Sequence, residues 1–268
     1  MITSGAFRRA GRRLAEVPAN AESRLSMRPL PGGAAQVNVA VLERPLLFDG
    51  PLDAGGAALR SLVDRELSVD MASPAGRGEL WTVQYRWWRE RPKFLLALAV
   101  PAPGGRPGIW RVEAFHEQLT YAAGAALLPG QEATGTIHTQ RRRTSLSFAD
   151  WIGPDLRLET TAALDKWRDR GSFGSLGVTL EARSASDRLS LVAEAAGWVS
   201  TDEAAPFQSG SLLIQWRPTR FTRGGWLAGA GIRRASSHAP LDIWPGAGTG
   251  HARIPLLRAH PLLDEGIL

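Results

Sequence analysis

The sequence predicts a mainly β protein, in which a partial α+β unit precedes an incomplete antiparallel transmembrane β-barrel. Three observations indicate this fold class. Apolar and polar residues alternate in segment after segment, tryptophans lie near the segment ends, and the longest apolar run, 94–100, stops at Pro101. That run is far shorter than the ~20 residues of a transmembrane helix. Because successive side chains of a strand face opposite sides, each segment presents one apolar and one polar wall, as strands of a membrane barrel do.

Composition limits the classes of function. The chain has 268 residues, of which 44% are hydrophobic, which suits one or two folded domains. It contains no cysteine, so a disulfide framework, a cysteine nucleophile and a thiolate metal site are excluded. The net charge of +6 comes from arginines scattered over predicted strand faces. We therefore expect no nucleic-acid partner, and favour arginines in a barrel lumen or at an anionic lipopolysaccharide surface.

The first domain is expected at 1–45. Helical spacing of Phe7, Ala10 and Leu14 predicts a short basic helix over 5–16 that ends before Pro18. Alternation predicts strands at 23–28 and 36–41, joined by a turn at Pro31-Gly32-Gly33. Residues 46–79 are expected to form a linker and the approach to the barrel, since 46–58 are rich in Gly, Pro and Ala.

The barrel itself is expected at 80–268. Most of its predicted strands reach the ~9–11 residues that cross a bilayer when tilted. They lie near 80–88, 94–100, 109–121, 133–148, 155–166, 173–183, 188–199, 209–217 and 226–236.

The polar wall of these strands carries charges. In 156–165, Leu156, Leu158 and Leu164 share one face, whereas Arg157 and Glu159 lie on the other. A soluble β-domain with one buried face predicts the same alternation. Most of the ten tryptophans lie at predicted strand ends, which favours a membrane barrel with aromatic girdles at its two interfaces.

Residues 240–268 show no alternation and are expected to form a long functional loop. The glycine-rich stretch 246–250 lacks the lysine of a phosphate-binding loop. The spacing of His238, Asp242, His251 and His260 matches no compact zinc pattern, and no nucleophile elbow stands in the right context. We expect no enzyme, and hence no catalytic residue, cofactor or metal.

Two features resemble a known family. The helix–strand–strand unit ending in Glu43-Arg44-Pro45, followed by a barrel, resembles outer-membrane assembly and translocation proteins of the BamA/TamA type, the bacterial surface antigen barrels with POTRA domains. Residues 1–45 would then be the C-terminal part of a POTRA-like domain. The loop 256–262 is similar to the signature loop of that family, with Arg258 at its arginine, although Ala259 and His260 replace the usual glycine and aromatic residue.

The resemblance implies that Arg258 folds back into the lumen and pairs with a carboxylate. Arginine suits this role because its planar fork can bind a carboxylate through two parallel bonds. The candidate lumen partners are the inward carboxylates Glu159, Asp165, Glu181 and Glu194.

The arginine triplet Arg141, Arg142 and Arg143 interrupts a predicted strand. Two interpretations stay open for it. It is either a solvated strand end or loop, or a contact for anionic lipid or lipopolysaccharide.

The resemblance also implies a location and a function. We expect an outer membrane of the Gram-negative type, with the N-terminal part in the periplasm. The function would be insertion of outer-membrane proteins or translocation of a protein substrate. The partners would be lipid or lipopolysaccharide, an unfolded outer-membrane or secreted protein, and other subunits of an assembly complex.

A passive outer-membrane pore or transporter and a soluble β-rich binding protein remain the alternatives. Neither a signal peptide nor enough strands to close a barrel is visible, so we expect the chain to be part of a longer protein.

Overall fold

The structure is a computed structural model that describes residues 3–89, 91–122, 136–184, 186–216, 228–244, 246–247 and 260–261. It is mainly β, as the alternation predicted. The elements in chain order are α1 Ser4–Ala15, β1 Asn20–Pro29, η1 Pro31–Gly33, β2 Ala35–Glu43, α2 Pro51–Asp64, β3 Glu66–Ala72, β4 Leu80–Arg86, β5 Lys93–Pro101, β6 Ile109–Ala122, β7 Thr136–Trp151, β8 Leu156–Trp167, β9 Gly171–Arg183, β10 Leu189–Ser200, β11 Phe207–Trp216, β12 Ala228–Ala235, β13 Gly246–Ala247 and β14 His260–Pro261.

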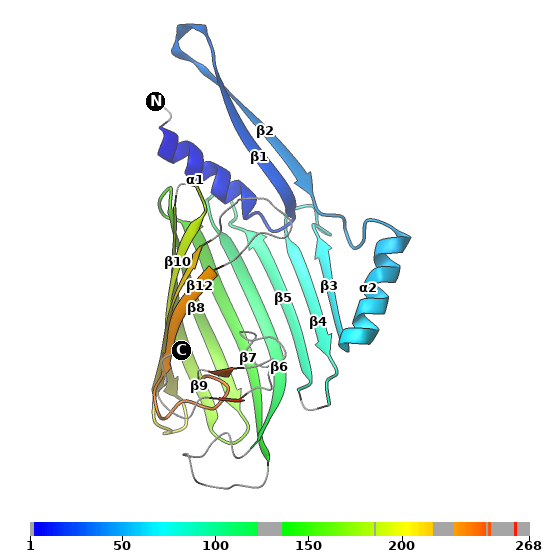
Figure 1. Ribbon diagram of the computed structural model, residues 1–268, viewed down its shortest axis with the longest axis vertical. Helices are drawn as coiled ribbons and strands as arrows, with labels where there is room; N and C mark the ends of the chain where they lie inside the picture. Colours follow the sequence, from blue (N-terminus) through cyan, green and yellow to red (C-terminus); the bar gives the residue numbers. More distant parts are fainter. Residues whose placement is uncertain are drawn as a thin grey trace.

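The N-terminal unit has the predicted helix and hairpin. The side chain of Thr3 accepts a hydrogen bond from the backbone N–H of Ala6 at 3.1 Å and so caps the first turn of α1. Gly32, with φ of 82°, allows the tight turn between β1 and β2. The hairpin projects away from the rest of the chain, while α1 lies across one end of the large sheet (Figure 1).

The segment after this unit differs from the expected linker. Residues 51–64 form α2, with Pro51 at its start, and 66–72 form β3. α2 lies beside β3 (Figure 1) and turns its small side chains Ala54, Ala57 and Ser61 toward it, since these are the less exposed positions of the helix. Among the described residues, no helix is long and apolar enough to cross a membrane.

The rest of the fold is one ten-stranded antiparallel meander in the order β12-β11-β10-β9-β8-β7-β6-β5-β4-β3. The sheet is strongly curled (Figure 1). The strands β4 to β12 lie where the alternation predicted them, with ends that differ by a few residues. Over the described part of the chain, β3 and β12 each pair on one side only and are the edges of the sheet.

The two faces of the sheet have opposite chemistry. We call the face of Arg157, Glu159, Asp165 and Trp167 the inner face and the opposite one the outer face. On β8 the inner positions toward the C-terminal end are buried, whereas Leu164 on the outer face is 68% exposed. The register extends this division to the neighbouring strands β7 and β9, where Arg142 opposite Lys166 is a charged exception on the outer face. The apolar wall is therefore the exposed wall, and the charged wall is the enclosed one.

Several tryptophans differ from the girdle prediction. Trp151, Trp167 and Trp198 are 1%, 1% and 5% exposed and lie on the inner face. Trp110 and Trp216 lie on the outer face and are 37% and 48% exposed. Closeness to a strand end does not decide which face a side chain takes; its parity along the strand does.

The segment after β12 folds back onto the inner face. Ala239 joins a buried cluster of Trp167, Phe173, Trp198 and Phe207, and Ile243 packs against the same cluster. We call residues 236–244 the return loop. Its backbone turns are held by hydrogen bonds from Ala239 N–H to the Ser236 carbonyl and from Ile243 N–H to the Pro240 carbonyl.

Candidate functional site

The inner face carries a buried charge cluster centred on Asp165. This residue is 1% exposed, and its carboxylate accepts hydrogen bonds from side chains of three other strands. The donors are Arg141 Nε at 2.9 Å, Arg143 Nη1 at 3.1 Å, Ser175 Oγ at 3.1 Å and Trp198 Nε1 at 2.9 Å. A carboxylate with this many donors is satisfied on both oxygens, as a buried charge has to be.

Strand parity brings the two arginines to this carboxylate. Arg143 lies directly opposite Asp165 in the register of β7 and β8, and Arg141 is two residues away on the same face. The guanidinium of Arg141 also stacks over the ring of Trp167 at 4.7 Å and over that of Phe115 at 5.5 Å. Aromatic rings thus hold the cation where the ion pair needs it.

Asp242 of the return loop binds the same arginine. Its carboxylate accepts from Arg141 Nη1 at 3.2 Å and from Trp167 Nε1 at 3.0 Å, and its side chain is 5% exposed. Arg141 is therefore shared between a carboxylate on the sheet wall and one on the loop. This shared arginine pins the return loop to the inner face.

Burial also changes the acidity of Asp242. Desolvation raises the pKa of Asp242 above its ordinary value of 3.8, although the charge of Arg141 and the hydrogen bond from Trp167 act in the opposite direction. Protonation of Asp242 therefore favours the docked loop over a released one.

Aromatic rings enclose the cluster. Trp198 and Phe207 stack with ring centroids 4.8 Å apart, and Trp167 meets Phe173 edge to face at 5.4 Å. This wall excludes water from Asp165, and ion pairs are stronger where the local dielectric is low.

The opposite end of the sheet has a second charged contact, made by α1. Arg13 pairs with Asp150 through Nε at 2.8 Å, and Arg12 pairs with Asp187 at 2.6 Å. Arg12 also lies 4.5 Å above the ring of Trp151. The acidic partners stand at the ends of strands or in turns of the large sheet, so α1 is clamped across that end.

The carboxylates proposed from sequence as lumen partners all lie on the inner face. Asp165 is the centre of the cluster, whereas Glu159 and Glu181 each pair with an arginine two residues away on their own strand. Glu194 accepts a hydrogen bond from Ser211 Oγ at 2.9 Å. Arg258 and Ala259 lie outside the described residues. For His260 only the backbone is described, and it pairs with Ala247 between β14 and β13.

The arginine triplet is divided between the two faces. It lies inside β7 and not at a strand end or in a loop. Arg141 and Arg143 turn inward to Asp165, which corrects both the solvated and the lipid-contacting interpretation for these two residues. Lipid contact stays a prediction for Arg142 alone, which is exposed on the outer face.

The role of Asp242 was not predicted from the sequence, where its spacing from the histidines matches no compact metal site. Among the described residues, no group of three or more potential ligands is placed to hold a metal ion. One signal was present in the sequence. Arg141, Arg143 and Asp165 lie on the polar face of two consecutive predicted strands, so the pattern placed their charges on one wall of the sheet, while their pairing depends on the register.

Fold and site together define a curled antiparallel sheet with an apolar outer face and a loop pinned to a charged inner face. No protein-family model matches this sequence, and no curated protein matches it. Among solved structures, the chain is similar to CdiB from Acinetobacter baumannii, with 10% sequence identity and a TM-score of 0.42. The match covers 82% of this chain and 44% of that one, so this chain spans less than half the length of CdiB.

Proposed function

We propose that this chain is part of an outer-membrane β-barrel that assists the insertion of outer-membrane proteins or moves a protein substrate across that membrane. The observation that supports this best is the inverted sheet. On the outer face Leu164, Leu176 and Val199 are 68%, 72% and 68% exposed, while Asp165 on the inner face is 1% exposed. A soluble β-domain buries its apolar face, whereas a membrane barrel exposes it to lipid.

The dimensions of the apolar wall fit a bilayer. Leu156 and Leu164 are separated by eight residues along β8, which is about 27 Å at ~3.4 Å per residue. A strand tilted by about 40° projects roughly 20 Å of this onto the membrane normal, close to the ~25 Å apolar band of outer-membrane barrels.

The edges of the sheet support a role in handling protein chains. β3 and β12 leave one side unpaired among the described residues, and the hairpin of β1 and β2 pairs with neither. Unpaired edges accept an extended segment by strand addition. An incoming strand would pair at β12, and the N-terminal unit, which we propose to be POTRA-like and periplasmic, would offer a further edge.

An edge-blocking pair of variants tests this function. Ala230 lies on the outer face of edge strand β12, and Ala195 lies on the outer face of β10, which is paired on both sides. Both A230K and A195K place a lysine on the lipid side, at similar cost, but only A230K introduces charge on an open edge. In cells that depend on the variant, we expect A230K to lower assembly or export of substrate protein while A195K does not.

Two other outcomes would favour the rival functions. A passive pore predicts that loss of the protein changes small-solute permeability and leaves substrate assembly intact. A soluble binding protein predicts recovery in the aqueous phase without detergent. Either result would contradict the proposal.

A further inference from the structure

The outer face has a cluster of exposed cations. Arg142 and Lys166 lie directly opposite each other in the register of β7 and β8, and Arg168 follows, held by its backbone N–H to the Gln140 carbonyl at 3.1 Å. All three cations are exposed, and none forms a salt bridge with the residues that the structure describes. Like charges directly opposite on a sheet destabilise it unless an anion lies between them.

These side chains surround a small hollow. Gln140, Arg142, Lys166 and Arg168 line a cavity of about 260 Å³. Next to it His116, opposite Arg142 in the register of β6 and β7, has a buried Nδ1 without a hydrogen-bond partner in the described structure. The hollow therefore offers several N–H donors, and its described lining contains no carboxylate. Such a set of side chains suits the binding of a phosphate group.

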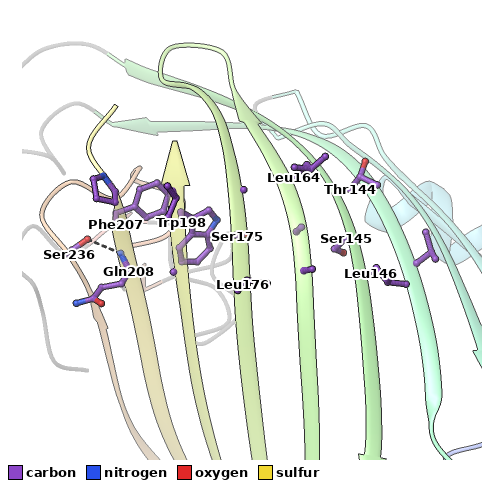
Figure 2. A pocket seen from close by; sticks show the side chains of 17 residues that line it. Thr144, Ser145, Leu146, Leu164, Ser175, Leu176, Trp198, Phe207, Gln208 and Ser236 are labelled. Carbon is purple, nitrogen blue, oxygen red and sulfur yellow. Dashed lines mark hydrogen bonds between the residues drawn. The ribbon is translucent and has the colours of Figure 1, made fainter. Parts of the chain in front are cut away.

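An apolar groove adjoins the hollow on the same face. We call it the outer groove, and its volume is about 1070 Å³, on the scale of a lipid- or drug-sized site. Leu146, Leu164 and Leu176, which are labelled in Figure 2, line it from three successive strands. Thr144 and Leu164, which line the groove, stand two residues from Arg142 and Lys166 on the same strands, so groove and cations are contiguous.

Glycines form the floor of the groove. Gly174 and Gly197 both line it, and a Cβ atom built on either residue would meet nothing within 4 Å. The groove floor is therefore open space that a side chain could fill, and not a gap already occupied by neighbours.

We propose that this surface binds a membrane lipid with an anionic, phosphate-bearing headgroup, with the phosphate on Arg142, Lys166 and Arg168 and an acyl chain in the outer groove. Charge complementarity selects the headgroup, and the apolar lining selects the chain. The cations stand where β8 is about to end at Trp167, the level at which long basic side chains reach the headgroup region of a bilayer. This inference rests on the proposed function, since it places the outer face in lipid.

Lipid retention tests the proposal. The full chain is prepared in nanodiscs of phosphatidylcholine with a minor fraction of phosphatidylglycerol, and the lipids that remain bound are counted by native mass spectrometry. The variant R142Q/K166Q/R168Q should bind phosphatidylglycerol more weakly by roughly fivefold for each cation removed, since one basic residue near an anionic surface contributes about that factor. The control R24Q/R28Q/R60Q removes the same charge from exposed sites on β1 and α2 and should bind as the unchanged chain does.

A groove-filling variant separates the headgroup from the acyl chain. G174L/G197L places apolar side chains on the floor, where a Cβ atom at either position would meet nothing within 4 Å, and should lower retention of phosphatidylglycerol while leaving all three cations in place. Equal retention of phosphatidylglycerol and phosphatidylcholine would overturn the proposal, as would full binding of inorganic phosphate alone, which would mark a free-anion site. Self-association lost in G174L/G197L would assign the groove to a second copy and also overturn it.

The failure of the proposed function gives a different result. A chain that inserts into neither nanodisc would contradict the membrane barrel itself. A chain that inserts but shows no preference for phosphatidylglycerol would contradict the lipid site alone.

Discussion

Replacement of Asp165 by asparagine tests the central charge cluster. The amide in D165N would keep the shape of the side chain but leave Arg143 without the carboxylate that it meets at 3.1 Å. Arg141 would keep Asp242 as a partner. Because Asp165 is 1% exposed and the Arg143 side chain only 19%, D165N removes one partner of a largely buried ion pair, which typically costs about 3–5 kcal/mol. We expect D165N to lower the free energy of unfolding by about that amount.

Urea unfolding in detergent micelles, followed by tryptophan fluorescence, measures this cost. With a slope of about 3 kcal/mol/M, the midpoint should fall by about 1 to 1.7 M. The control E194Q removes an inner-face carboxylate that is exposed and accepts one bond, from Ser211, and should shift stability by no more than about 0.5 kcal/mol.

A second substitution separates charge from shape. R143M/D165N removes the stranded cation and should be more stable than the sum of the two single changes predicts. A D165N protein within about 0.5 kcal/mol of the unchanged chain would refute the argument that this cluster is desolvated and holds the inner face together.

Two further predictions concern the ends of the sheet. The substitution D242A removes the acceptor of Arg141 and Trp167 and should weaken docking of the return loop by about 1.5–3 kcal/mol, the value of hydrogen bonds to charged groups, which faster labelling of a cysteine placed at Ser236 would show. Because the pKa of Asp242 is raised in the docked loop, docking should strengthen as pH falls through that pKa toward 3.8 and weaken as pH rises. D242A should abolish this pH dependence. Unchanged labelling, or a pH dependence that persists in D242A, would contradict the role of Asp242 in holding the return loop on the inner face. The substitutions R12Q/R13Q should loosen α1 and speed trypsin cleavage at Arg8 and Arg9 by roughly tenfold or more. High salt should have the same effect, because the pairs with Asp187 and Asp150 are only partly buried. R24Q/R28Q is the control, and equal cleavage in both variants would contradict the contact of α1 with the sheet.

The strands were predictable because their pattern has a period of two and most are long. β8 shows this well, since its leucines alternate with the charged residues Arg157, Glu159 and Asp165 over most of its length. β3 alternates too, with apolar residues on one face, but over only seven residues after a glycine-rich stretch. α2 contains Gly55 and Gly56, which lower helix propensity, so its composition suggested a linker.

The candidate site was predictable only in part. Parity placed Asp165 on the charged wall. The pairing of Arg141 with Asp242 as well depends on the return loop folding back onto the sheet, and these two residues are 101 positions apart in the sequence. No local pattern carries that contact. The buried Trp167 and Trp198 show the same limit, because their positions at strand ends said nothing about which face they occupy.

The most direct test of the inverted sheet is a cysteine scan along β8. The chain contains no cysteine, so each substitution from Leu156 to Trp167 reports a single position in the protein reconstituted in lipid vesicles. Each cysteine carries a spin label, and its exposure to oxygen in lipid and to a water-soluble relaxation agent is compared. We predict a period of two, with the even-numbered outer positions exposed to lipid and the odd-numbered inner positions shielded from it. Even-numbered positions that contact water and not lipid would contradict the account.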